Sequence, residues 1–169
     1  MARAAAKKKP AARRKAARKV SVARKPVRRA KPTARAKAPA KVRRPPQRFV
    51  VSHHRDEDFK ADGLRAYAKY RDLGIAKATN GMVQAHVIRL VPPCTDEVRK
   101  RHLHNVEFQM VYVLKGWMKN EFEGQGEQVM RAGTCWIQPP GIKHTVLDYS
   151  DDCEVLEIIM PAEFATVEV

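Results

Sequence analysis

Two histidines one residue apart, His102 and His104, carry the clearest chemical signal in the sequence. On a β-strand, residues two apart point to the same face, so these imidazoles would lie side by side as a chelating pair. Glu107 and Gln109 share one face of the strand expected next, and His144 follows forty residues after His104. Several imidazoles with one side-chain oxygen are a donor set for a divalent metal ion.

The residues by themselves leave other interpretations open. Two histidines on a strand also occur as surface groups or as hydrogen-bonded groups without a metal. Glu107 is either an exposed acid on a loop or the candidate catalytic residue, acting as a metal ligand, as an acceptor for an imidazole N–H or as a general base. His86, on an earlier expected strand, either lines the interior or faces water.

The wider spacing resembles the two motifs of the cupin superfamily. The residues that match the first motif are His102, His104, Gln109 and Gly116. The residues that match the second motif are Gly133, Pro139, Gly141 and His144. Gln109 stands where the family usually has Glu, and Asp148 stands where it usually has Asn. The Gly that usually opens the first motif is replaced by Asp96.

This resemblance covers about residues 83–167 and implies a double-stranded β-helix, or jelly roll, with a metal ion in its mouth. The ligands that it implies are His102, His104, Gln109 and His144. Such donors suit Fe, Mn, Ni, Zn or Co, so the identity of the one divalent metal ion stays open. Because the amide of Gln109 is uncharged, the site would keep its full dipositive charge and attract an anionic chelating ligand.

The elements that must position these residues are mostly short β-strands. Turn residues such as Gly116, Gly133 and Gly141 separate runs of β-type residues, a pattern typical of a sandwich or barrel. The predicted strands are residues 83–91, 108–114, 117–122, 128–130, 134–137, 144–147 and 153–160. A helix is predicted earlier, between Asp58 and Leu73, and Gly74 is its expected C-terminal cap. The fold class is therefore mainly β, a cupin barrel with one N-terminal helix.

The charge of the chain is divided unevenly. Of the 34 Lys and Arg residues, 20 lie in residues 1–48, where there is no acid, and the other 14 face all 18 Asp and Glu residues. The basic segment has no aromatic residue and six prolines, so we expect it to be disordered in isolation. We therefore predict three parts: a disordered tail at 1–48, a linker and helical lead-in at 49–81, and a β-barrel at 82–169.

In composition, residues 1–48 resemble the tails of linker histones and of histone-like bacterial proteins. Dense positive charge binds phosphate polyanions by releasing counterions, which predicts non-specific contact with nucleic acid. The alternatives are a solubilising tail, an organelle-targeting peptide and an extension from a wrongly chosen start codon.

Two classes of function follow from these observations. The leading hypothesis is a metal-dependent small-molecule enzyme, of the oxygenase or isomerase type, acting on a chelating, anionic substrate. The alternative is a non-catalytic cupin sensor or binding module that the basic segment localises to nucleic acid, and a barrel without metal is a third. No apolar run reaches the ~20 residues that span a bilayer, so we expect no membrane contact. We expect a cytoplasmic protein, nucleoid-associated if the tail binds DNA, and the resemblance also implies a homodimer.

Overall fold

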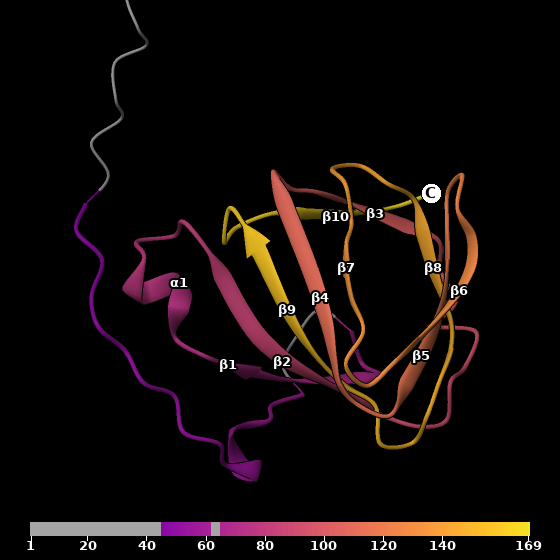
Figure 1. Ribbon diagram of the computed structural model, residues 1–169, viewed down its shortest axis with the longest axis horizontal. Helices are drawn as coiled ribbons and strands as arrows, with labels where there is room; N and C mark the ends of the chain where they lie inside the picture. Colours follow the sequence, from indigo (N-terminus) through magenta and orange to yellow (C-terminus); the bar gives the residue numbers. More distant parts are fainter. Residues whose placement is uncertain (1–44, 62–64) are drawn as a thin grey trace, which may run out of the picture. The chain divides into compact units, whose positions relative to one another are not determined.

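The described part of the protein is built from two antiparallel five-stranded sheets. A computed structural model describes residues 45–61 and 65–169. Figure 1 shows strands β2, β9 and β4 side by side, with β8, β5 and β6 across from them. The strands are β1 (Ala68–Asp72), β2 (Gln84–Leu90), β3 (His102–Asn105), β4 (Phe108–Lys115), β5 (Trp117–Phe122), β6 (Gly126–Arg131), β7 (Cys135–Ile137), β8 (His144–Tyr149), β9 (Glu154–Met160) and β10 (Ala165–Glu168).

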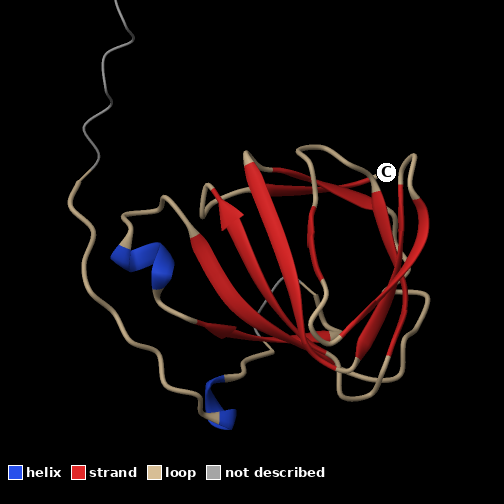
Figure 2. Ribbon diagram, viewed as in Figure 1, coloured by secondary structure: helices blue, strands red, loops and turns tan. Residues whose placement is uncertain are grey.

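Strands that are distant in sequence are neighbours in both sheets. The first sheet, sheet A, has the order β1-β2-β9-β4-β7, and the second, sheet B, has the order β10-β3-β8-β5-β6. A 3-10 turn (Asp56–Asp58) and one short helix, α1 (Ile75–Ala78), precede β2 and lie outside the sheets (Figure 2). The mainly β class is confirmed, and the one α-helix of the described residues is the four-residue α1, which follows β1.

The hydrophobic core comes from the inward faces of the strands. Val111 and Val113 of β4 alternate with the exposed Tyr112 and Leu114, as expected of a strand with one buried face. These two valines pack in one cluster with Val155 of β9 and with side chains from both sheets. Further along the same faces the inward residues become polar, so the sequence builds a core and a polar site from the same strands.

Gly116 makes the tight connection between β4 and β5. Its φ of +67° lies in the left-handed region that favours glycine. A Cβ there would collide with the side chain of Ser150 and would lie 2.6 Å from Oδ1 of Asp152. A larger residue would therefore displace the turn before β9, which carries a residue of the site described below.

The helix expected between Asp58 and Leu73 is wrong. Residues 62–64 are not described, but Ala68–Asp72 is strand β1, which pairs with β2 along its whole length. Apolar residues three and four positions apart give only a weak preference for a helix. The hydrogen bonds and packing that β1 gains by pairing with β2 outweigh that preference. Gly74 does not end a helix either; it has a φ of +74° at the N-terminal cap of α1.

The strands predicted after residue 82 are confirmed with small shifts at their ends. The sequence also missed β10, which pairs with β3. The predicted disorder and nucleic-acid contact of residues 1–48 fall largely outside the described residues, which begin at residue 45. In the described part of the chain, no helix has the length and apolar character needed to cross a membrane.

Candidate metal centre

Three histidines meet on the inner face of sheet B. His102 and His104 alternate along β3, and His144 opens β8 directly opposite His102. One ring nitrogen from each lies within 4.8 Å of the others, and the rings of His102 and His144 are 4.3 Å apart between centroids. His102 and His144 are buried, and His104 is partly buried. The pairing of two strands thus brings together residues that are forty positions apart.

Hydrogen bonds fix which nitrogen of each ring is available. Nδ1 of His102 lies 2.8 Å from the carbonyl oxygen of Lys100, and Nδ1 of His144 lies 3.1 Å from that of Ile142. A carbonyl oxygen only accepts, so both Nδ1 atoms must donate a proton. Each neutral ring then keeps its lone pair on Nε2. Nδ1 of His104 lies 2.9 Å from the hydroxyl of Thr166, which can accept or donate, so this contact holds the ring without fixing its tautomer.

The three imidazoles are held in the neutral form. Burial lowers the pKa of His102, and it lowers the pKa values of His104 and His144 to about 4. The positive charge that a neighbouring imidazole would carry adds to this effect. Neutral rings with inward lone pairs and anchored outer nitrogens fit a divalent transition-metal ion, whose histidine ligands are held in this way.

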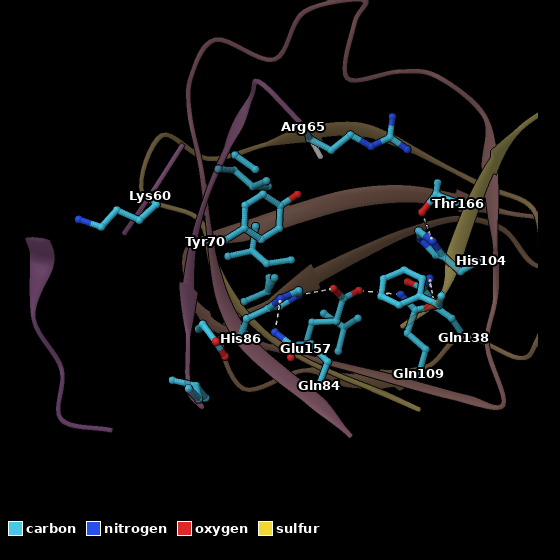
Figure 3. A pocket seen from close by; sticks show the side chains of 18 of the residues that line it. Lys60, Arg65, Tyr70, Gln84, His86, His104, Gln109, Gln138, Glu157 and Thr166 are labelled. Atoms are coloured by element: carbon cyan, nitrogen blue, oxygen red, sulfur yellow. Dashed lines mark hydrogen bonds and ion pairs between the residues drawn. The ribbon is translucent and has the colours of Figure 1, made fainter. Parts of the chain in front are cut away.

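A cavity of about 990 Å³ lies in front of this cluster. Both sheets line it, with His104 and Thr166 from sheet B and Tyr70, His86 and Glu157 from sheet A. Figure 3 shows His86 and Glu157 joined on one side of the cavity, with His104 and Thr166 on the other. A volume of this size accommodates a small organic molecule together with water.

Comparison with known protein families supports the same fold. The family model described as "Cupin domain" matches residues 90–159. No curated protein sequence matches the chain.

Solved structures support the cupin fold. KdgF from Halomonas sp. has a TM-score of 0.52 and 17% identity, over 66% of this chain and 96% of that one. The polyketide cyclase RemF from Streptomyces resistomycificus has a TM-score of 0.54 and 19% identity, over 70% and 85%. Oxalate decarboxylase from Lactobacillus farciminis, in a formate complex, has a TM-score of 0.52 and 16% identity, over 67% and 34%. At these identities the likeness shows the fold alone, and it confirms the predicted jelly roll.

On sheet A, a hydrogen-bonded row of side chains crosses four neighbouring strands. Its members are Trp136, Gln138, Gln109, Glu157 and His86, and we call them the amide–carboxylate chain. Nε1 of Trp136 donates to Oε1 of Gln138 at 3.1 Å, and Nε2 of Gln138 donates to Oε1 of Gln109 at 3.2 Å. Nε2 of Gln109 donates to Glu157 at 2.6 Å, and Nε2 of His86 lies 2.7 Å from the other carboxylate oxygen.

The two ends of the amide–carboxylate chain fix the direction in which its hydrogen bonds run from donor to acceptor. The indole of Trp136 only donates and an ionised Glu157 only accepts, so the two amides between them have a single consistent orientation. Nε2 of Gln138 also lies 3.3 Å from Nε2 of His144, which agrees with a lone pair on that imidazole nitrogen. The amide–carboxylate chain therefore connects the side chains of sheet A to the histidines of sheet B.

Gln109, the expected oxygen ligand, is 2% exposed at the centre of this chain. Its amide nitrogen faces Glu157, and its oxygen accepts from Gln138, the residue that also contacts His144. A metal ion on Nε2 of His144 would take the lone pair that now accepts the N–H of Gln138. The structure thus brings Gln109 into the region of the three histidines through Gln138.

Glu107, the expected catalytic acid, is not brought to the cluster. It is exposed and precedes β4, and its backbone N–H donates to the carbonyl oxygen of Met160. It borders a separate surface depression of about 170 Å³ with Thr79 and Pro161. The reason is that the chain enters β4 only at Phe108, so the inward alternation begins with Gln109.

The buried carboxylate that the sequence interpretation missed is Glu157. Its side chain is 13% exposed and lies directly opposite His86 in the pairing of β9 with β2. Burial by itself raises the pKa of Glu157, but the hydrogen bond and charge of His86, together with the hydrogen bond from Gln109, hold it below its usual value. One signal was present: Glu157 alternates with Val155 and Ile159, two residues of an apolar run that point inward.

Proposed function

We propose that the protein is a metal-dependent small-molecule enzyme that transfers a proton on a chelating, anionic substrate, as an isomerase does. The observation that carries this proposal is a single cavity lined by both the three inward imidazoles and the His86–Glu157 pair. Oxygenase chemistry requires a metal ion with open coordination positions. A buried acid–base pair is required for proton transfer, so its presence favours the isomerase type.

A divalent ion of the Fe, Mn, Ni, Zn or Co type would be held by His102, His104 and His144, with Gln109 as the proposed oxygen ligand. Such an ion would polarise a carbonyl or carboxylate oxygen of the substrate. The tautomers of His102 and His144 support this assignment, because both rings keep the lone pair of Nε2 for a metal ion without rearrangement.

His86 and Glu157 have complementary roles in the proposed proton transfer. Glu157 accepts the Nε2–H of His86, which leaves the lone pair of His86 on Nδ1. That atom takes a proton from one carbon of the substrate and returns it to a neighbouring carbon, so the reaction balances without an oxidant. Glu157 stabilises the imidazolium that exists between the two steps, because the opposite charges lie 2.7 Å apart.

A structural role alone explains this pair poorly. Both side chains are only 12–13% exposed, and removing the charge of Glu157 from water costs several kcal/mol. A well-packed apolar pair at the same place is often equally stabilising or more so. A buried carboxylate and imidazole that line a cavity are therefore better explained by proton transfer than by stability.

The test follows hydrogen exchange into substrate carbons. The metal-loaded protein is incubated in D2O with a panel of small 2-oxo and 2-hydroxy acids, and NMR records the loss of C–H signals. We expect exchange in the wild type and its loss in His86→Gln, which keeps an N–H for Glu157 and keeps the metal. Oxygen uptake with the same compounds that is unchanged in His86→Gln would show oxygenase chemistry instead. Binding without exchange or oxygen uptake would show the non-catalytic alternative.

A second proposal concerns residues 1–48 and rests on charge alone. Twenty basic residues without an acid favour binding to nucleic acid through phosphate contacts, with no base preference. This binding would localise the cupin domain without taking part in its chemistry. Retention of the full-length protein on DNA that falls steeply with salt supports this proposal, and no salt-sensitive retention contradicts it.

A further inference from the structure

Arg65, just before β1, lines the same cavity as the three histidines. Figure 3 shows its side chain reaching across the cavity towards the side that holds Thr166 and His104. Its positive charge contributes to the lowered pKa values of His102 and His104, which agrees with a guanidinium that faces them. Arg65 thus places a permanent cation opposite the imidazoles.

The guanidinium of Arg65 is incompletely paired within the described part of the chain. Its Nη2 is buried and has no hydrogen-bond partner among residues 45–61 and 65–169. Its Nη1 makes one long contact, 3.4 Å to the carboxylate of Glu168, whose own side chain is 59% exposed. The Arg65 side chain is only 13% exposed and lies over the ring of Tyr67. Because a guanidinium carries five donors, a buried one with a single weak contact is equipped for a further acceptor.

A second buried polar atom lies in the same cavity. Asn120 of β5 is 2% exposed, and its Oδ1 has no hydrogen-bond partner in the described residues. It occupies the inward position between Met118 and Phe122, and it pairs with Val146, two residues after His144. A hydroxyl group both donates and accepts, so a ligand hydroxyl would satisfy the Asn120 amide in either of its orientations.

We propose that Arg65 binds the carboxylate of the substrate and that Asn120 binds a hydroxyl group, so that the substrate is a hydroxycarboxylate. The planar fork of arginine matches a carboxylate with two parallel hydrogen bonds. One arginine suits the two oxygens of a carboxylate better than the three oxygens and double charge of a phosphate. The subsite deepens the proposed function and rests on it, since the metal would bind the same ligand from the opposite side.

The test uses three matched ligands: lactate, propionate without the hydroxyl, and lactamide without the charge. NMR titration measures their affinities for the metal-free and metal-loaded full-length protein. We expect Arg65→Gln to weaken lactate binding by about 10- to 100-fold and to remove the preference for lactate over lactamide. Asn120→Leu should remove the preference for lactate over propionate in the metal-free protein, where chelation makes no contribution. Arg131→Gln, an exposed change outside the cavity, is the matched control.

The failures of the subsite and of the metal site are distinguishable. Full metal content with unchanged lactate binding in Arg65→Gln overturns the subsite and leaves the metal proposal intact. Absence of bound metal in the wild type overturns the proposed function, and the metal-free titrations then test Arg65 alone. If Arg65→Gln does not fold, Arg65→Lys keeps the charge without the planar fork, and affinity equal to wild type contradicts the proposal. Inorganic phosphate that binds more tightly than lactate would also overturn it.

Discussion

The two walls of the cavity are built differently. The wall of sheet B is uncharged, with three imidazoles whose outer nitrogens are anchored to Lys100, Thr166 and Ile142. The wall of sheet A contains a carboxylate and an amide–carboxylate chain that crosses four strands. One wall is suited to hold a cation through neutral donors, and the other is suited to move a proton. The difference teaches that one cavity can combine a neutral wall and a charged wall, with Gln109 and Gln138 as the residues that connect them.

The largest effect is expected from substituting the histidines of sheet B, because this should abolish metal binding. His102→Ala combined with His104→Ala deletes two of three converging nitrogens, so bound metal should fall to background. Elemental analysis of the purified variant and wild type measures this. The amide–carboxylate chain on sheet A should stay intact in this variant. His86→Gln is the control, and it should keep full metal content. Wild-type stoichiometry in the double variant would place the metal elsewhere.

A smaller effect is expected when the charge of the sheet A wall is removed. Glu157→Gln deletes a buried negative charge and leaves one acceptor for two donors, His86 and Gln109. Metal affinity should fall about 10-fold, the size typical of losing an outer partner of a metal site. Competition with a metal indicator measures it. Glu107→Gln, an exposed acid outside the cavity, should change nothing; a larger effect there than in Glu157→Gln would reverse our assignment.

The pH dependence of the free energy of unfolding should come from the histidines of sheet B. His104 and His144 have pKa values of about 4 when folded, against about 6.5 when unfolded. The unfolded chain therefore binds more protons between these values, so metal-free stability is complete above about pH 6.5 and is lost as pH falls towards 4. Two such groups give a slope of at most ~2.7 kcal/mol per pH unit. Urea unfolding at several pH values should show a shallower slope in the His102→Ala, His104→Ala variant than in wild type.

The smallest effect on either wall is expected from removing residues 1–44. The described residues that line the cavity all lie beyond residue 49, so metal content and thermal stability should stay within error of the full-length protein. Binding to DNA should be lost, because most of the excess positive charge is removed. Truncated protein that loses metal would show that the basic segment supports the site directly.

Sequence reasoning found the wall of sheet B and missed most of the other. His102, His104 and His144 sit within short, regular spacings, so their positions could be predicted from a motif and strand alternation. His86 and Glu157 are 71 residues apart and meet through the register of β2 with β9, which no local pattern specifies. Their types alone did not indicate that they would be paired.

The errors in the fold have a similar cause. β1 and β10 are short strands at the edges of their sheets, and each is defined by its partner more than by its own residues. Glu107 was misplaced because β4 begins at Phe108, one residue after it, so Glu107 lies outside the alternation that turns Gln109 inward.

X-ray absorption spectroscopy of the zinc-loaded, full-length protein tests the central claim most directly. The metal site is expected to show three imidazole groups with nitrogens about 2.0–2.1 Å from zinc, completed by oxygen donors. The His102→Ala, His104→Ala variant should lose that signal, and His86→Gln should retain it. Sulfur neighbours from the cysteines, or a spectrum with fewer than three imidazoles in wild type, would contradict the three-histidine site.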